Sequence, residues 1–181
     1  IVLIGHHIGE DTHNTQLQDF SMALKRGAEL VVADPRFSVA ASKAKDWLPI
    51  KPGTDTALLL AWLNVLITEE LYDRAYVEQY TIGIEQLIEH VQPHTPEWAA
   101  EITEIDAFTI RRIAREMAAK APRAVIPVNR HAVWYGADDT HRMRALYLVN
   151  VLLGNYGVKG GYYFCDAPTV EAYPHPDLPL A

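Results

Sequence analysis

Two carboxylates, Asp34 and Asp55, follow two short segments that the sequence predicts as strands. Leu30–Ala33 is an apolar run too brief for a buried helix, and Asp34 ends it. Asp55 comes after a second run, Trp47–Ile50, and the turn Pro52-Gly53-Thr54. The carboxyl ends of parallel strands share one edge of a sheet, where an acid can accept hydrogen bonds from a ribose. The two acids therefore predict a nucleotide site at that edge.

A simpler interpretation of the second acid stays open. Thr54 stands where it can cap a helix that begins at Asp55, and the helix dipole favours a carboxylate in the first turn. On this interpretation the two residues only start a helix. Polar groups that gather at successive strand ends favour the nucleotide site instead.

A third polar group follows the predicted strand Ile1–Ile4, in the loop that runs from Gly5 to Glu10 and contains His6 and His7. Backbone N–H groups and imidazoles in such a loop can donate to phosphates or to a polar ring. A metal cluster formed with Asp11 and His13 is the alternative, but adjacent histidines in a turn point apart. The GxGxxG fingerprint is absent, which argues against a plain NAD-dependent dehydrogenase.

The order of these segments indicates the α/β class, with a Rossmann-like, mainly parallel sheet and helices on both faces. We expect one sheet to hold four strands, at Ile1–Ile4, Leu30–Ala33, Trp47–Ile50 and Arg123–Pro127. We expect helices at about 15–25, 55–70, 75–80, 84–91, 107–120 and 140–153, with a further one starting at Thr95-Pro96. After the last strand candidate, polar residues gather again at Arg130 and His131.

Composition limits the possible functions. The 181 residues fit one domain, which we place at residues 1–164, with a Pro-rich connecting tail at residues 165–181. A formal net charge of −7 argues against a nucleic-acid partner. The chain has one cysteine, so it forms no disulfide within itself, and no apolar run approaches the length of a membrane span. The apolar start without methionine suggests a piece of a longer protein, so the missing signal peptide says nothing about export.

Several motifs together resemble one family. The phrase DPRFSVAASKAKDWLPIKPGTD, followed by an Ala/Leu-rich helix, is similar to the pterin-dinucleotide segment of the molybdopterin oxidoreductases, the dimethyl sulfoxide reductase superfamily. TPEWAAEIT, the helix that carries Arg142 and Arg144, and GNYGVKGG occur in the family's order. The first loop has Gly5-His6-His7-Ile8 where many members have Gly-Xaa-Asn-Pro. With NRHAVWYGADDTHR, this loop resembles the polysulfide and thiosulfate reductase catalytic subunits.

The resemblance implies a molybdopterin guanine dinucleotide (bis-MGD) cofactor with molybdenum or tungsten, and roles for particular residues. Asp55, after Pro52 and Gly53, would accept from the two donors of guanine. Asp34 would hold a ribose, and Arg36 with the loop from Gly5 to Glu10 would meet the diphosphate. Arg130 and His131 are candidates for reaching the pterin or the substrate, or are surface residues of a loop. We expect neither a catalytic residue nor a metal ligand within the fragment, and a 4Fe-4S cluster outside it.

For the parent protein, the resemblance implies reduction of a small sulfur compound, such as polysulfide or thiosulfate, in anaerobic respiration. The expected partners are an iron–sulfur electron-transfer subunit and a membrane anchor subunit, with the parent on the periplasmic or another extracytoplasmic side of the membrane and no membrane insertion of its own. Two alternatives remain. One is a related molybdoenzyme for arsenate, tetrathionate or formate, and the other is a stand-alone nucleotide-binding module without redox activity.

Overall fold

A computed structural model of the chain describes residues 1–6, 8–10, 14–128 and 139–163. Within these residues the strands are β1 (Val2–Ile4), β2 (Val31–Ala33) and β3 (Asp46–Leu48). The α-helices are α1 (Asn14–Lys25), α2 (Asp55–Thr68), α3 (Arg74–Tyr80), α4 (Ile84–Val91), α5 (Pro96–Thr103), α6 (Ala107–Lys120) and α7 (Asp139–Leu152). A short 3-10 turn, η1 (Ala41–Lys43), lies between β2 and β3.

The strands form one parallel sheet in the order β1-β2-β3, with Val2 opposite Val31 and Val31 opposite Asp46. Helix α1 connects β1 to β2, so the predicted βαβ start is confirmed. The loop with η1 connects β2 to β3 without an α-helix. All three carboxyl ends therefore point to the same edge of the sheet.

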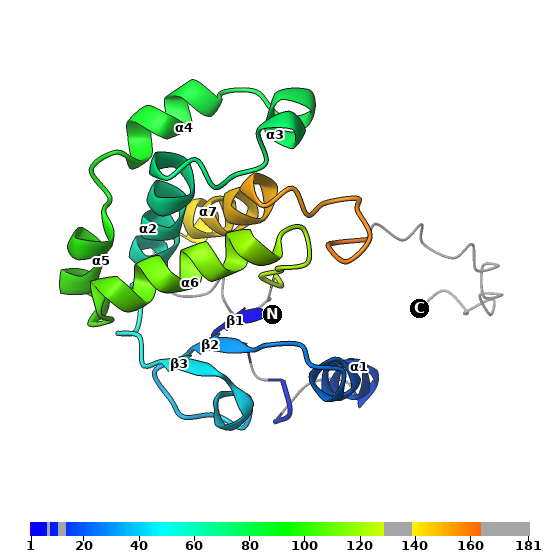
Figure 1. Cartoon of the computed structure of the whole chain (residues 1–181). Helices are drawn as coiled ribbons and strands as arrows, with labels where there is room; N and C mark the ends of the chain where they lie inside the picture. The colour runs from blue at the N-terminus through cyan, green and yellow to red at the C-terminus, as the bar shows by residue number, and fades with distance from the viewer. Residues whose placement is uncertain (7, 11–13, 129–138, 164–181) are drawn as a thin grey trace, which may run out of the picture.

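Helices cover both faces of this sheet, as the α/β class requires (Figure 1). Alternate side chains of a strand point to opposite faces. Leu3 and Val32 pack toward α1, where Phe20 and Leu24 contact their cluster. The other side chains of β1 and β2, together with Leu48, join a larger core built on α2, α6 and α7.

Helix α2 is the centre of that larger core, and it packs against α5, α6 and α7 (Figure 1). Ten of its 14 residues are buried, including the fully buried Trp62. A helix that is apolar around its whole circumference belongs inside a protein. The start of α2, with Asp55, is consequently held in a fixed place beside the sheet edge.

The predicted fourth strand, Arg123–Pro127, is wrong: this segment does not extend the sheet. It makes one backbone hydrogen bond with β1, from Val2 N to Val125 O at 2.9 Å. On its other side, the Asn150 side chain bonds both the N–H and the C=O of Ile126 at 3.0 Å. Asn155 donates to Ala124 O at 2.7 Å. Two buried amide side chains take the place of a neighbouring strand, which sequence periodicity does not reveal.

Side-chain caps begin three of the helices. Asp73, Thr95 and Asp106 accept from backbone N–H groups in the first turns of α3, α5 and α6. The expected helix starts at Thr95-Pro96 and at residue 107 are thereby confirmed. None of the helices in the described part of the chain is both long enough and apolar enough to span a bilayer.

Candidate functional site

The carboxyl edge of the sheet is where the sequence predicts a ligand, and backbone hydrogen bonds continue there beyond the ends of the strands. Gly5 N donates to Ala33 O at 2.9 Å, and Asp34 N donates to Leu48 O at 3.1 Å. Gly5 has φ +56°, a conformation that glycine adopts at little cost. The pairing of the strands thus fixes the residue that follows β1 and the residue that follows β2.

Asp34 is the most distinctive group at this edge, because its side chain is charged and its residue is only 4% exposed. Its Oδ1 accepts from Arg36 N at 2.8 Å, which closes a tight turn. Trp47 on β3 donates from Nε1 to the Asp34 carbonyl at 2.9 Å. No described group hydrogen-bonds Oδ2, which is also buried. A buried acceptor without a partner is costly, so Oδ2 is suited to a donor brought by a ligand.

The loop after β1 meets the loop after β2 through Glu10. Its carboxylate accepts from Arg36 Nη2 at 2.5 Å and from Val39 N at 3.0 Å. His6 lies on the same loop and is 5% exposed. The structure therefore brings Gly5, His6, Glu10 and Arg36 to one corner of the sheet edge. The Arg36 side chain remains 55% exposed and can still approach an anion.

The turn before α2 contains a glycine with positive φ and lacks the expected cap. Gly53 has φ +80°, and a Cβ added there would meet no heavy atom within 4 Å. Thr54 Oγ1 donates to Lys51 O at 2.6 Å. The predicted capping role of the Thr54 side chain is wrong, because the hydroxyl bonds backward within the turn and makes no bond to the helix. Pro52 and Gly53 are exposed beside this uncapped helix start.

Asp55, in the first turn of α2, forms a largely buried ion pair with Arg142 of α7. Arg142 Nη1 lies 2.7 Å from Asp55 Oδ2. The two side chains are 7% and 16% exposed, for Arg142 and Asp55 respectively. Asp55 is therefore more than a residue that starts a helix. The pair joins the first turn of α2 to the first turn of α7.

Three predicted site residues, His7, Arg130 and His131, lie outside the described residues. The remaining eight follow the carboxyl ends of the three strands along the chain, after β1 (Gly5, His6, Glu10), after β2 (Asp34, Arg36) and between β3 and the first turn of α2 (Pro52, Gly53, Asp55). Arg142 is the functional candidate that the sequence argument did not select. The available signal was an arginine near the start of a helix, where the positive end of the dipole disfavours a cation.

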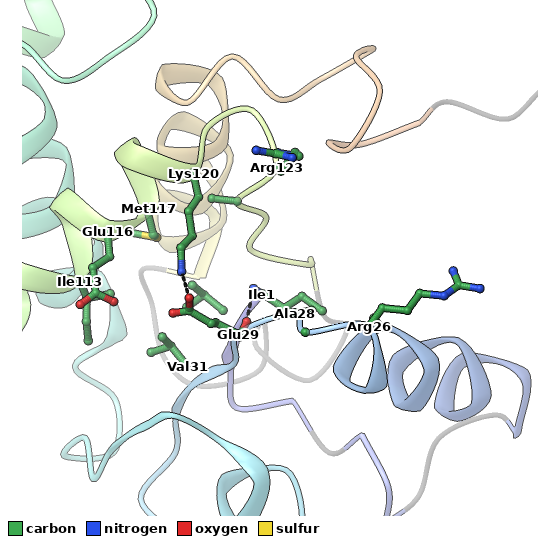
Figure 2. Close-up of a pocket in the computed structure, with 14 residues that line it drawn as sticks. Ile1, Arg26, Ala28, Glu29, Val31, Ile113, Glu116, Met117, Lys120 and Arg123 are labelled. Atoms are coloured by element: carbon green, nitrogen blue, oxygen red, sulfur yellow. Dashed lines mark hydrogen bonds and ion pairs between the residues drawn. The ribbon is translucent and has the colours of Figure 1, made fainter.

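The opposite, amino edge of the sheet carries a pocket of a different kind (Figure 2). Lys120, at the end of α6, bonds Glu29, which lies just before β2. Lys45 bonds both Glu29 at 2.9 Å and Glu116 at 3.0 Å. The bond to Lys120 first, and then that to Lys45, lower the pKa of Glu29 to about 2. The two acids and two lysines of this network pair with one another, so this pocket is not our candidate site.

No group of three or more His, Cys, Asp or Glu residues in the described part of the chain is arranged to hold a metal ion. Asp34 and Asp55 instead each accept a hydrogen bond, from Arg36 N and from Arg142 Nη1 respectively. Such a site suits an organic ligand rich in hydroxyl and N–H groups. Fold and site together define an α/β domain whose ligand edge lies at the carboxyl ends of a parallel sheet.

The chain belongs to the molybdopterin oxidoreductase family, whose profile matches residues 1–165. It is 40% identical over 163 residues to the thiosulfate reductase molybdopterin-containing subunit PhsA of Salmonella typhimurium, with 90% of this chain and 21% of PhsA covered. It is 33% identical over 171 residues to the arsenate respiratory reductase molybdopterin-containing subunit ArrA of Shewanella sp.. That match covers 81% of this chain and 20% of ArrA.

A solved structure also matches, that of acetylene hydratase from Pelobacter acetylenicus. The TM-score is 0.79 at 37% sequence identity, and the match covers 84% of this chain and 21% of the other. The chain thus spans about a fifth of the length of these relatives. The family resemblance and the α/β class are confirmed, as is the assignment to a family of oxidoreductases.

The family implies a molybdopterin cofactor, and the described residues fit such a group. A buried carboxylate oxygen of Asp34, Oδ2, accepts no hydrogen bond from a described group and can accept one from a ligand at the carboxyl edge. Asp55 adds a second carboxylate, whose one described side-chain partner is Arg142. Hydroxyl and N–H donors of a large organic cofactor would satisfy these acceptors.

Proposed function

We propose that this domain binds one guanine dinucleotide arm of a bis(molybdopterin guanine dinucleotide) cofactor. The observation that carries the proposal is the buried Asp34 carboxylate, whose Oδ2 has no hydrogen-bond partner among the described residues. An ionised carboxylate is kept at such a position when a ligand supplies the missing donor. A ribose hydroxyl at the carboxyl edge supplies it.

Asp55 is the proposed guanine acceptor. Guanine presents two adjacent donors, N1–H and the exocyclic amine, and a carboxylate can accept both. Adenine presents an acceptor at N1 and would face the carboxylate with a lone pair. The bond from Arg142 occupies one lone pair of Oδ2, and Oδ1 has no described partner. Asp55 therefore retains the acceptors that guanine recognition needs.

The diphosphate lies, in this proposal, near Gly5, His6 and Arg36. The Arg36 guanidinium, paired with Glu10 but still half-exposed, supplies positive charge next to the turn made by Asp34. His7, and Pro52 and Gly53 at the start of α2, complete the predicted set of cofactor contacts. Arg130 and His131 are proposed for the pterin or the substrate.

For the whole enzyme, we propose the two-electron reduction of a sulfur compound such as thiosulfate or polysulfide. Support comes from 40% identity to a protein named as a thiosulfate reductase subunit and from the loop sequence after β1. The metal and pterin supply the redox chemistry, and the residues described here bind and orient the cofactor. A 4Fe-4S cluster, an electron-transfer subunit, a membrane anchor subunit and an extracytoplasmic location belong to the same proposal.

Guanine selectivity tests the binding proposal. We expect the chain to bind GDP more tightly than ADP by about 10- to 100-fold, the value of one or more charge-assisted hydrogen bonds. Asp55→Asn should remove most of this difference, because the amide offers one acceptor and one opposing donor. Calorimetric titration gives both affinities. Equal affinities of the unchanged chain for GDP and ADP would contradict the proposal.

A matched control is Asp106→Asn, which also removes a carboxylate at a helix start but lies at α6. It should leave the preference for GDP unchanged. Because Asp55→Asn also breaks the bond to Arg142, unfolding in urea must be measured for each variant. If Asp55→Asn retains the full preference, the guanine contact lies elsewhere.

The substrate proposal needs the complete subunit, loaded with cofactor and assayed with a reduced viologen dye. We expect turnover with thiosulfate or polysulfide, and little with arsenate, tetrathionate or formate. The 181-residue chain alone should contain no stoichiometric molybdenum or tungsten. Turnover of arsenate alone would support the alternative of a related molybdoenzyme. A complete subunit without redox turnover would support the alternative of a nucleotide-binding module.

A further inference from the structure

The ion pair between Arg142 and Asp55 connects two helix starts that are 87 residues apart in the sequence. Helices α2 and α7 pack against each other along the larger core (Figure 1). Arg142 Nη1 donates to Asp55 Oδ2 at 2.7 Å, and both side chains are mostly hidden from water. The contact is therefore screened little by solvent and defines one orientation of the carboxylate.

Local preferences argue against an arginine at this position. Arg142 is the fourth residue of α7, so it lies close to the positive end of that helix dipole. Burying a guanidinium and a carboxylate also costs solvation free energy, and a well-packed apolar pair is often as stable. Stability of the fold alone is thus a weak reason for a charged pair here.

We propose that Arg142 is a positioning residue for nucleobase recognition: it holds the Asp55 carboxylate so that its free acceptors face the two donors of guanine. This inference rests on the proposed function, because it assigns the guanine contact to Asp55. Arg142 itself does not touch the base. It uses one lone pair of Oδ2 and leaves Oδ1, together with the second lone pair of Oδ2, for the ligand.

A carboxylate that accepts two parallel donors must lie close to the plane of the base. An unrestrained aspartate populates several side-chain rotamers, and most of them present only one oxygen to a given donor pair. A buried guanidinium removes that freedom before the ligand arrives. Preorganisation of this kind increases selectivity for the second donor, because both hydrogen bonds form without a further ordering cost.

The exocyclic amine of guanine is the donor that reports on this orientation, and hypoxanthine lacks it. GDP and IDP differ in that amine alone, so the ratio of their affinities isolates one hydrogen bond to Asp55. For the unchanged chain we expect GDP to bind about 10-fold more tightly than IDP. Arg142→Gln should reduce this ratio to about 3-fold or less, mainly through weaker GDP binding.

Arg142→Lys is the conservative variant and guards against a failure to fold, since it keeps a buried cation opposite Asp55. Its single ammonium restrains the carboxylate less than a planar guanidinium does, so the GDP to IDP ratio should fall between those of the other two chains. Arg115→Gln is the matched control, because Arg115 of α6 pairs with Glu69 at the end of α2 opposite to Asp55. That variant should keep the full ratio.

Titration calorimetry with GDP and IDP, alongside urea unfolding, separates the possible results. If the unchanged chain prefers GDP and Arg142→Gln loses that preference while Arg142→Lys retains part of it, the positioning role is supported. If both Arg142 variants keep the full ratio and only their stability falls, Arg142 is a structural connection between helices and the inference is wrong. If the unchanged chain does not distinguish GDP from IDP, the proposed contact between Asp55 and guanine is wrong, and the positioning role of Arg142 is wrong with it.

Discussion

The two edges of the sheet hold charge in opposite ways. At the amino edge, Glu29 shares its carboxylate between Lys45 and Lys120, and all three side chains are nearly half exposed. At the carboxyl edge, Asp34 and Asp55 are buried or nearly so, with one oxygen of Asp34 left without a described partner. A carboxylate is paired with two cations at one edge, whereas a carboxylate at the other edge has only part of its hydrogen-bonding capacity used.

This difference distinguishes exposed surface ion pairs from buried charges that are suited to binding a ligand. Exposed ion pairs contribute little to folding, because water and salt screen them. A buried carboxylate costs free energy unless it is fully hydrogen-bonded, so its retention at a sheet edge indicates a use other than stability. The pocket at the amino edge contains no such unsatisfied buried group among its described lining residues.

The largest expected effect comes from removing the buried cation. Arg142→Met leaves the Asp55 carboxylate without its described partner, and losing one member of a buried pair costs about 3 kcal/mol of unfolding free energy. Lys120→Met, the equivalent change at the amino edge, should cost far less. Urea unfolding followed by tryptophan fluorescence measures both, because Trp62 is fully buried. Equal losses in the two variants would remove the distinction between the edges.

A smaller effect of opposite sign is expected at Asp34. Asp34→Asn keeps the acceptor for Arg36 N but removes a buried charge whose second oxygen lacks a described partner. We expect the unfolding free energy without ligand to rise by about 1 kcal/mol, while GDP affinity falls. Thermal unfolding with and without GDP measures the two effects together. A variant that loses stability and keeps GDP affinity would show that the carboxylate is structural.

The smallest effect concerns pH at the amino edge. The pKa of Glu29 is about 2 in the folded chain and near 4.5 when unfolded, chiefly because Lys120 and Lys45 bond its charged form. A lowered pKa gives stability that is fully present above about pH 4.5 and is lost as the pH falls toward 2. Glu29→Gln should therefore make unfolding free energy depend slightly less on pH across this window.

Salt provides the control for that measurement. The Glu29 contribution should shrink further at about 1 M NaCl, where the screening length is roughly 3 Å. The loss caused by Arg142→Met should change little with salt, because that pair is buried. A pH dependence of Glu29→Gln identical to that of the unchanged chain would mean that the exposed network has no measurable role.

Local patterns predicted much of the fold. Short apolar runs ended by Asp34 or by a Pro-Gly turn located β2 and β3 within two residues, and α4 matches its predicted bounds, Ile84–Val91, at both ends. These features are local, because an apolar run or a capping residue acts on its own neighbours. The prediction that several polar groups gather at one sheet edge followed from strand direction alone.

The rest depends on contacts between distant residues. The segment 123–127 has the composition of a strand, yet Asn150 and Asn155 occupy its backbone groups from a helix and a turn far along the chain. Thr54 has the residue type of a helix cap, yet its hydroxyl donates to Lys51 O in the preceding turn. The pairing of Asp55 with Arg142 could not be foreseen from spacing, because nothing in either local sequence specifies the partner.

The buried amides of Asn150 and Asn155 also bear on how copies of this chain meet one another. An extended segment beside a sheet, with open N–H and C=O groups, is a template on which a strand of another molecule can add. Here the side chain of Asn150 hydrogen-bonds both the N–H and the C=O of Ile126, and the side chain of Asn155 donates to the C=O of Ala124. The side of this segment that faces away from β1 therefore offers a second chain little to pair with. In the described part of the chain no further strand lies at this border, and the two asparagines leave few open backbone groups there for intermolecular pairing.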